Sequence, residues 1–170
     1  MTVSVIRSSP EETHTDEALF AALYPALRRF AAAVRPPEVD ADDLVQEALA
    51  RTLATRLLAD CDDPGAYLRT AIVRLVSNHR RSMGRRGRAF ARLRVNDTDA
   101  PSFPSDLADL MHLPPRDRAV LYLVVVESWS YADAADVLGC NEAAARARAS
   151  RALKRLRVEM VNEDREADNA

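Results

Sequence analysis

Apolar side chains recur at helical spacing in three segments of the first half of the chain. The first segment begins at Asp16 and ends near residues 35–37, because tandem prolines remove backbone donors and keep the preceding residue out of the helical region. The second begins at residues 40–43, where aspartates suit the positive end of a helix. The third follows an Asp-rich turn and starts at Ala66. Three amphipathic helices of this length can share one small core.

The second half of the chain predicts a further helical unit. Residues 116–127 form a strongly apolar segment, and Ser130 with Asp133 has the pattern of a capping box. Gly139 then supplies a turn, and Asn141 can cap a long last helix. This order of signals is typical of a helix-turn-helix. One face of the last helix is expected to hold Ala145, Ala149, Ala152 and Leu156, leaving a slim basic face outward.

A glycine-, arginine- and proline-rich stretch separates the two units and has no apolar periodicity. We therefore predict an all-α protein with two small helical domains joined by a flexible linker, the C-terminal one a helix-turn-helix. The expected boundaries are a flexible arm at 1–14, a first domain at 15–86, a linker at 87–104, a second domain at 105–160 and an acidic tail at 161–170.

Composition excludes several classes of protein. The chain has 170 residues, of which 48% are hydrophobic and 29% charged, as in soluble globular proteins. No apolar run approaches the roughly 18 residues of a membrane span, and no signal core opens the chain, so a cytoplasmic location is expected. The two cysteines and three histidines have no metal-ligand spacing, and no catalytic motif is present. We expect neither an enzyme nor a cofactor or metal.

Charge is strongly segregated although the net charge is only −2. Residues 64–96 contain nine basic and no acidic side chains, and residues 143–158 contain six basic and no acidic ones. The segments around them are acidic. A polyanion that contacts both basic blocks would gain from counterion release at each, so nucleic acid is the predicted partner.

Two motifs resemble those of bacterial extracytoplasmic-function sigma factors. Residues 42–47 (DDLVQE) are similar to the polymerase-binding signature of that family, and residues 113–121 (LPPRDRAVL) are similar to the opening of its fourth domain. The resemblance implies that the first motif lies on a helix that docks on the clamp helices of the largest subunit of the polymerase. Its exposed matches in this chain are Asp43, Gln46, Glu47 and Arg51.

The same resemblance assigns both basic blocks to promoter DNA. Residues 67–81 are similar to the helix that approaches the minus-ten element, residues 60–65 occupy the position of a base-capturing loop, and residues 141–157 correspond to the reader of the minus-thirty-five element. The last helix has alanines where the family has larger side chains, which predicts mainly phosphate contacts. The implied DNA-binding residues are Arg69, Arg74, Asn78, Arg80, Arg81, Arg146, Arg148, Ser150, Arg151 and Lys154.

The implied function is that of a bacterial alternative sigma factor, with core RNA polymerase, promoter DNA and an anti-sigma factor as partners. An alternative is a sigma-like protein-interaction module that occupies an anti-sigma factor without productive promoter reading, which the alanine-rich last helix favours. A third class, a stand-alone helix-turn-helix repressor, needs a dimer to read two half-sites and leaves the DDLVQE helix without a role.

Overall fold

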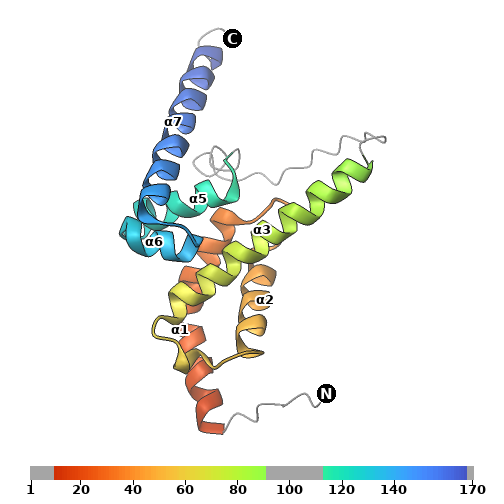
Figure 1. Cartoon of the computed structure of the whole chain (residues 1–170), viewed down its shortest axis with the longest axis vertical. Coiled ribbons are helices and arrows are strands. Elements are labelled where there is room, and N and C mark those ends of the chain that lie inside the picture. Colours follow the sequence, from red (N-terminus) through yellow and green to blue (C-terminus); the bar gives the residue numbers. More distant parts are fainter. Residues whose placement is uncertain (1–9, 91–112, 168–170) are drawn as a thin grey trace.

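The computed structural model describes residues 10–90 and 113–167, which are helical without any strand in these two ranges. The first unit comprises α1 (Pro10–Val34), α2 (Ala41–Leu53), a short 3₁₀ turn η1 (Leu58–Asp60) and α3 (Pro64–Phe90). The second comprises α5 (Pro115–Leu121), a π-helical turn η2 (Tyr122–Val126), α6 (Tyr131–Leu138) and α7 (Glu142–Ala167). In Figure 1, α1, α2 and α3 pack together, α5 lies against α1 and α3, and α6 lies against α3. The predicted all-α fold is confirmed.

The three long helices of the first unit bury one apolar stripe each. Leu27, Phe30 and Val34 on α1 repeat at intervals of three and four, the spacing that places side chains on one face of a helix. The matching stripes are Leu44, Val45 and Ala48 on α2 and Leu68, Ile72 and Val76 on α3. All of these side chains are buried, and removing water from them supplies most of the stability of the bundle.

The helix caps and the turn predicted for the helix-turn-helix are confirmed. Ser130 caps α6 by accepting a hydrogen bond from the Asp133 amide at 3.1 Å. Gly139 ends α6 in the left-handed region, at φ 63°. Asn141 Oδ1 then accepts from the Ala144 amide at 2.8 Å at the start of α7. The predicted stripe of small residues on α7 is buried, with Leu156 packed at its edge.

Helix boundaries differ from the sequence prediction at three places. α1 begins at Pro10, inside the segment expected to be a flexible arm; proline is favoured at a first helical position, and acidic residues suit the first turn. α3 continues to Phe90, into the expected linker, because its arginines are good helix formers that offset the cost of two glycines. α7 continues to Ala167, into the expected acidic tail. Residues 91–112, most of the predicted linker and the start of the second domain, lie outside the described residues.

The single helix expected at residues 116–127 is interrupted. α5 ends at Leu121, and the chain widens into the π-helical turn η2. Val125 and Val126 in this turn are exposed, at 63% and 62% of their surface. Ser128 follows with a positive φ of 58°, which reverses the chain toward α6. A regular helix with this apolar content would be expected to bury its valines. In this turn, two of them stay at the surface instead.

The two units share one continuous core. The ring of Phe30 on α1 meets the ring of Tyr122 edge-on, with centroids 5.7 Å apart. Arg118 of α5 is buried, and its Nη2 donates to the carbonyl oxygens of Val34 and Arg35 at 3.0 Å each. A cation is favourable at these carbonyls, because the C-terminus of a helix carries partial negative charge. Burial lowers the pKa of the Arg118 guanidinium to about 10, so it stays charged at neutral pH.

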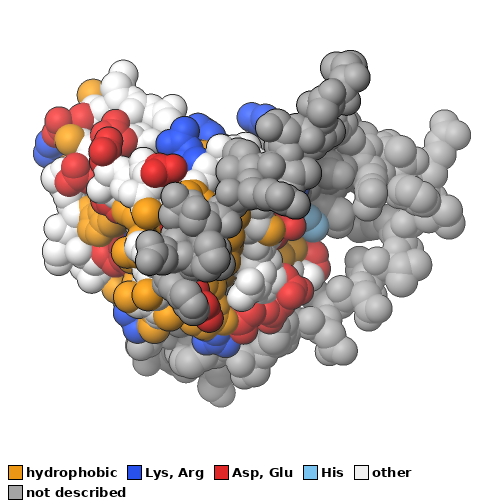
Figure 2. All heavy atoms as spheres, turned by 90° about the horizontal axis from the view of Figure 1, so that it is seen from below, with side chains coloured by type: hydrophobic (Ala, Val, Ile, Leu, Met, Phe, Trp, Pro, Cys, Tyr) orange, Lys and Arg blue, Asp and Glu red, His pale blue; other side chains and the backbone are white. Residues whose placement is uncertain are grey.

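The face of the molecule seen from below in Figure 2 is apolar at its centre, with groups of acidic side chains toward both sides. Lysine and arginine side chains are scattered at its edges. This face is therefore not where the basic side chains of the described residues gather.

Candidate functional site

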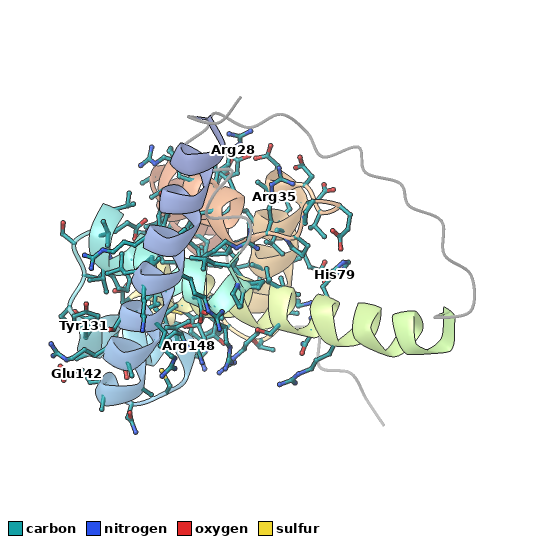
Figure 3. All side chains as sticks on the ribbon, turned by 90° about the horizontal axis from the view of Figure 1, so that it is seen from above. Arg28, Arg35, His79, Tyr131, Glu142 and Arg148 are labelled. Atoms are coloured by element: carbon teal, nitrogen blue, oxygen red, sulfur yellow. The ribbon has the colours of Figure 1, made fainter. Side chains whose placement is uncertain are left out.

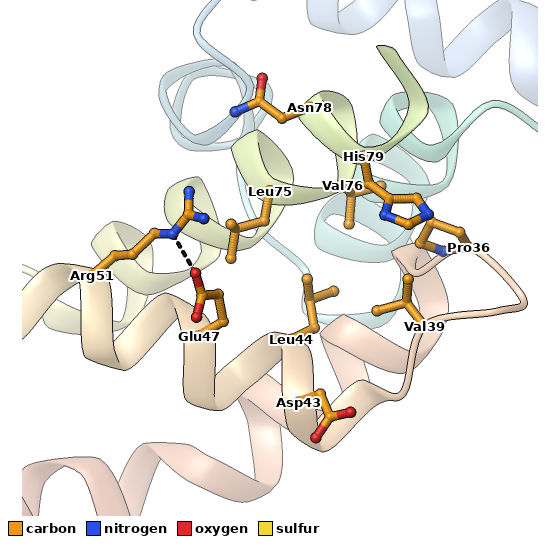
Figure 4. A pocket seen from close by; sticks show the side chains of 10 residues that line it. All are labelled: Pro36, Val39, Asp43, Leu44, Glu47, Arg51, Leu75, Val76, Asn78 and His79. Carbon is orange, nitrogen blue, oxygen red and sulfur yellow. Dashed lines mark hydrogen bonds and ion pairs between the residues drawn. The ribbon is translucent and has the colours of Figure 1, made fainter. Parts of the chain in front are cut away.

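An apolar groove runs between α2 and α3. Its volume is about 410 Å³, and Figure 4 shows the side chains that line it. The apolar lining comprises Pro36, Val39, Leu44, Leu75 and Val76, and the polar lining comprises Asp43, Glu47, Arg51, Asn78 and His79. An apolar centre with a polar rim is the usual anatomy of a protein–protein interface.

Three of the four residues predicted to bind the polymerase line this groove. Glu47 and Arg51 form an ion pair one helical turn apart, with Arg51 Nε 2.6 Å from Glu47 Oε1 and both side chains at least half exposed. Asp43 is exposed at the start of α2. Gln46, the fourth residue, is exposed on the same helix but is not part of the groove lining.

The start of α2 is held by polar contacts that orient this groove. Asp40 is the N-cap, and its Oδ1 accepts from the amides of Asp42 at 2.7 Å and Asp43 at 3.3 Å. The carboxylate of Asp42 accepts from the hydroxyl of Tyr24 and, at 2.8 Å, from Arg28 Nε on α1. These two donors hold the pKa of Asp42 below its usual range. Asp42 thus joins α2 to α1.

The exposed face of α3 holds a basic stripe. Arg74, Asn78 and Arg81 are exposed and follow one another at intervals of four and three, so they lie on one face. Asn78 also lines the groove, so the stripe adjoins the candidate protein-binding surface. The side chain of Arg80, also predicted to bind DNA, lies outside the described side chains.

Arg69 lies away from this stripe, contrary to the expectation that it lines a path for DNA. It is only 6% exposed, and its Nη2 is 2.8 Å from Glu127 Oε1 of the second unit. Its guanidinium also stacks 5.1 Å from the centre of the Trp129 ring. The physical reason is its position on α3, next to Leu68 on the buried face. Sequence reasoning missed Glu127 and Trp129 as its partners, since no local pattern links residues 58 positions apart.

The segment that resembles a base-capturing loop lies beside the second unit. Cys61, Asp62 and Asp63 line a pocket of about 270 Å³ together with Asp136 and Val137 of α6. Asp63 also caps α3, since its Oδ1 accepts from the Ala66 amide at 2.8 Å. Neither cysteine is in a disulfide.

The basic side chains of α7 divide into exposed and paired groups. Arg151 and Lys154 are exposed, and so is the neutral Ser150 between them and Arg146. Arg146 is exposed as well, but it pairs with Glu142 at 2.6 Å and lies over the Tyr131 ring at 4.6 Å. Figure 3 labels Glu142 and Arg148 on α7 and Tyr131 on the neighbouring α6.

Arg148 is held inside the second unit. Its Nη1 is 2.6 Å from Oδ1 of Asp117 on α5, and Arg155 lies 3.7 Å from the other oxygen of the same carboxylate. Asp117 is buried, so this contact fixes α7 on α5. Sequence reasoning placed Arg148 among the DNA contacts and did not find Asp117, although the burial of Ala145, Ala149 and Ala152 indicates that Arg148 borders the packed face.

The described residues contain no group of three or more histidine, cysteine or acidic side chains placed to bind a metal ion. Over the same residues, no helix combines the length and the apolar character that crossing a membrane requires.

Family models match both units. Residues 19–86 match Sigma-70 region 2, and residues 110–156 match Sigma-70 region 4. The chain is 33% identical over 150 residues to the ECF RNA polymerase sigma factor EcfG of Rhodopseudomonas palustris (strain TIE-1), covering 79% of each chain. It is 32% identical over 160 residues to the RNA polymerase sigma-E factor of Streptomyces coelicolor, covering 84% of each.

Solved structures agree with these matches. The sigma factor RpoE of Bartonella quintana, crystallised with the anti-sigma factor NepR, is 25% identical with a TM-score of 0.66, covering 82% of this chain and 92% of that one. The PhyRSL–NepR complex of Sphingomonas sp. Fr1, 21% identical with a TM-score of 0.55 over 82% and 85% of the two chains, shares the fold.

The fold and the two matched regions define a transcription initiation factor of the sigma-70 class, not an enzyme. Within that class, the chain belongs to the extracytoplasmic-function sigma factors, which are alternative sigma factors that direct transcription initiation.

Proposed function

We propose that the groove between α2 and α3 is the surface through which this chain docks on core RNA polymerase. The observation that supports this assignment is the position of Asp43, Glu47 and Arg51, which lie at the rim of one apolar groove. Apolar contacts at the centre of such a surface supply affinity, and the charged rim sets the orientation of the partner. Gln46 extends the same surface along the exposed side of α2.

Promoter DNA is proposed to contact the two basic helices. The α3 stripe of Arg74, Asn78 and Arg81, with Arg80, guides the minus-ten strand during opening. The exposed α7 side chains Arg146, Ser150, Arg151 and Lys154 lie along the minus-thirty-five element. Their charge favours phosphate contacts, whereas the alanines between them offer few hydrogen bonds to bases. Both of these DNA contacts are made on the chromosome, so we expect the protein to act in the cytoplasm.

An anti-sigma factor is a further proposed partner. RpoE of Bartonella quintana, which shares the fold of this chain, was crystallised with the anti-sigma factor NepR.

The second candidate function, a sigma-like module that only occupies an anti-sigma factor, rests on the alanine-rich α7. The exposed Arg151 and Lys154 on α7 and the exposed Arg74 and Arg81 on α3 favour promoter binding instead.

Replacing Asp43 by arginine tests the docking surface. Asp43→Arg is expected to weaken association with core polymerase about tenfold or more, because it reverses a charge at the rim of the groove while leaving the buried face of α2 intact. The measurement is co-purification and titration of labelled protein with core polymerase. Glu17→Arg makes the same charge change at an exposed position of α1 and serves as the control. Equal binding by both variants would contradict the assignment of the groove.

The opening role of α3 is tested separately. Arg74→Ala with Arg81→Ala is expected to reduce promoter opening at moderate salt more than it reduces polymerase binding, because phosphate contacts are lost while the groove remains. Permanganate reactivity of unpaired thymines measures opening. If both assays lose activity equally, or neither does, α3 has no separate role in opening.

A further inference from the structure

We propose that Asp16 of α1 is a positioning residue for promoter opening, because it holds the loop of residues 57–63 in the shape in which this loop can capture a base. This inference rests on the proposed opening function and on the resemblance of residues 60–65 to a base-capturing loop. The sequence marks Asp16 only as the start of an amphipathic segment. Its further role comes from a contact that joins α1 to the connection between α2 and α3, which passes alongside α1 in Figure 1.

Asp16 is a buried carboxylate that bonds to the loop. The residue is only 6% exposed, and its Oδ1 accepts a hydrogen bond from the Ala59 amide at 2.9 Å, although the two residues are 43 positions apart. Within the described residues, the other carboxylate oxygen, Oδ2, is buried without a hydrogen-bond partner. A carboxylate is unfavourable in such a place unless it is hydrogen-bonded. The bond to Ala59 therefore offsets part of the cost of burying Asp16, and α1 and the loop hold each other.

The short turn η1 depends on an acceptor from elsewhere in the chain. η1 has three residues, and its N-cap, Leu57, makes no side-chain hydrogen bond to the amides that follow. The first amides of any helix lack an acceptor within the helix. Asp16 supplies an acceptor to Ala59, as an N-cap side chain would. The fully buried Leu58 anchors the same turn in the core, so Asp16 and Leu58 together fix where the loop begins.

The other end of the loop is fixed as well. Asp63 Oδ1 accepts from the Ala66 amide at 2.8 Å, and the Asp63 carbonyl accepts from the Tyr67 amide at 3.0 Å. Between the two anchors, Asp60 and Asp62 are exposed. A loop held at both ends loses less conformational freedom on binding than a free loop does. The exposed residues between the anchors can therefore meet an extruded base in a preformed shape.

The Asp16 anchor is separate from the polymerase-docking groove. The described residues that line the groove include neither Asp16 nor any member of the loop. α1 holds the start of α2 through other side chains, Tyr24 and Arg28, which bind Asp42. Loss of the Asp16 anchor is therefore expected to reduce promoter opening and to leave polymerase binding intact, a split that a general loss of folding does not produce.

Cys61 is a natural reporter inside the loop. It is half-buried, its amide donates to the Leu58 carbonyl at 3.0 Å, and its Sγ donates to the Leu57 carbonyl at 3.6 Å. These bonds tie the thiol to η1. Cys140→Ser leaves Cys61 as the remaining thiol of the full-length chain. The rate at which Cys61 reacts with an aromatic disulfide reagent, followed by absorbance, then measures how often the loop opens.

A set of substitutions in this background separates anchoring from general stability. Asp16→Ala is expected to raise the reaction rate of Cys61 about fivefold or more, as loss of a helix cap does for local opening. Asp16→Asn keeps an acceptor oxygen for the Ala59 amide and is expected to stay within about twofold of the wild-type rate. Val45→Ala is the matched control, because it removes buried apolar atoms of α2 without removing a hydrogen bond of the loop. It is expected to lower stability and to leave the Cys61 rate unchanged.

Promoter opening supplies the functional readout. Permanganate reactivity of unpaired thymines is measured with core polymerase at a promoter whose start site has been mapped by run-off transcription. Asp16→Ala is expected to open this promoter about fivefold less than the wild type, with an unchanged affinity for polymerase. Asp16→Asn is expected to restore opening, since it restores the acceptor for the loop.

Several results would overturn the anchor. An unchanged Cys61 rate in Asp16→Ala shows that the contact does not hold the loop. A faster Cys61 together with normal opening shows that opening does not need the held shape, while the proposed function stands. If Val45→Ala matches Asp16→Ala in both assays, general destabilisation is the cause. If Asp16→Asn matches it, the hydrogen bond to the loop is not the cause.

A replacement variant covers the case in which Asp16→Ala loses helix content by circular dichroism. Asp16→Leu fills the same space without an acceptor, so the same results are expected of it and the same results contradict the anchor. A wild-type protein that opens no promoter with polymerase contradicts the proposed function, and the role of Asp16 in opening falls with it. The Cys61 rates still decide whether Asp16 holds the loop.

Discussion

Two neighbouring aspartates at the start of α2 have opposite roles. Asp42 faces α1 and accepts from Tyr24 and Arg28, whereas Asp43 is exposed at the rim of the groove. The DDLVQE motif contains both, and a helical pattern alone places them 100° apart without saying which one faces a neighbour. The partner residues 14 and 18 positions earlier decide the question, and they become visible only once α1 packs on α2.

The role of Asp42 predicts a dependence of stability on pH. Because its pKa is lowered in the folded state, its stabilising contribution is fully present above its unfolded pKa, about 4, and is lost as pH falls through the folded value. Asp42→Asn is therefore expected to lower the urea midpoint by the same amount from pH 7 to pH 5 and by less below about pH 4. A difference between wild type and variant that grows on acidification would contradict this role.

At the scale of elements, the helices are predictable from sequence where local chemistry decides them. The alanine stripe of α7, the Ser130 cap and the Gly139 turn are all found as expected, because each depends on residues within four positions. η2 was not predictable in this way. Its valines suit a regular helix, and the contacts of the turn, such as that of Tyr122 with Phe30 of α1, come from residues far apart in the chain.

The turn between α6 and α7 gives a prediction on stability. Gly139→Ala is expected to destabilise the protein by about 1 kcal/mol, because a side chain at a φ of 63° is strained. No atom lies within 4 Å of the added methyl group, so strain and not a clash causes the loss. Chemical denaturation measures it, and Gly139→Asn, which tolerates this conformation better, is expected to lose less. An unchanged midpoint for the alanine variant would contradict the strained turn.

The exposed face of α7 predicts how DNA binding responds to salt. Arg151→Ala is expected to reduce the slope of log affinity against log salt by about 0.9, the value for one lost phosphate contact. Its effect should be similar on different cognate promoters. Arg116→Ala removes one exposed charge from α5 and is the control, with an unchanged slope. If Arg151→Ala instead abolishes discrimination at a single guanine, this residue reads a base.

At the scale of the whole molecule, the two matched regions form one packed body with a shared core. The sequence predicts two helical units and the family, but not their contact. Arg69 and Glu127 are 58 positions apart, and each has a satisfactory local explanation as a surface charge. Charge segregation correctly separates the acidic α2 from the basic α3 and α7. It does not reveal which arginines are exposed. Arg69 is buried against Glu127 of the second unit, and Arg148 is partly covered by its contact with Asp117 of α5.

Run-off transcription with purified core RNA polymerase from the same bacterium is the most direct test of the account. A library of chromosomal fragments serves as template, and transcripts are mapped with and without the protein. The account predicts discrete start sites that appear only when the wild-type chain is added, and their loss when Asp43→Arg replaces it. Transcripts that do not depend on the chain, or start sites that Asp43→Arg supports as well as the wild type, would contradict the assignment of the α2–α3 groove and the initiating role built on it.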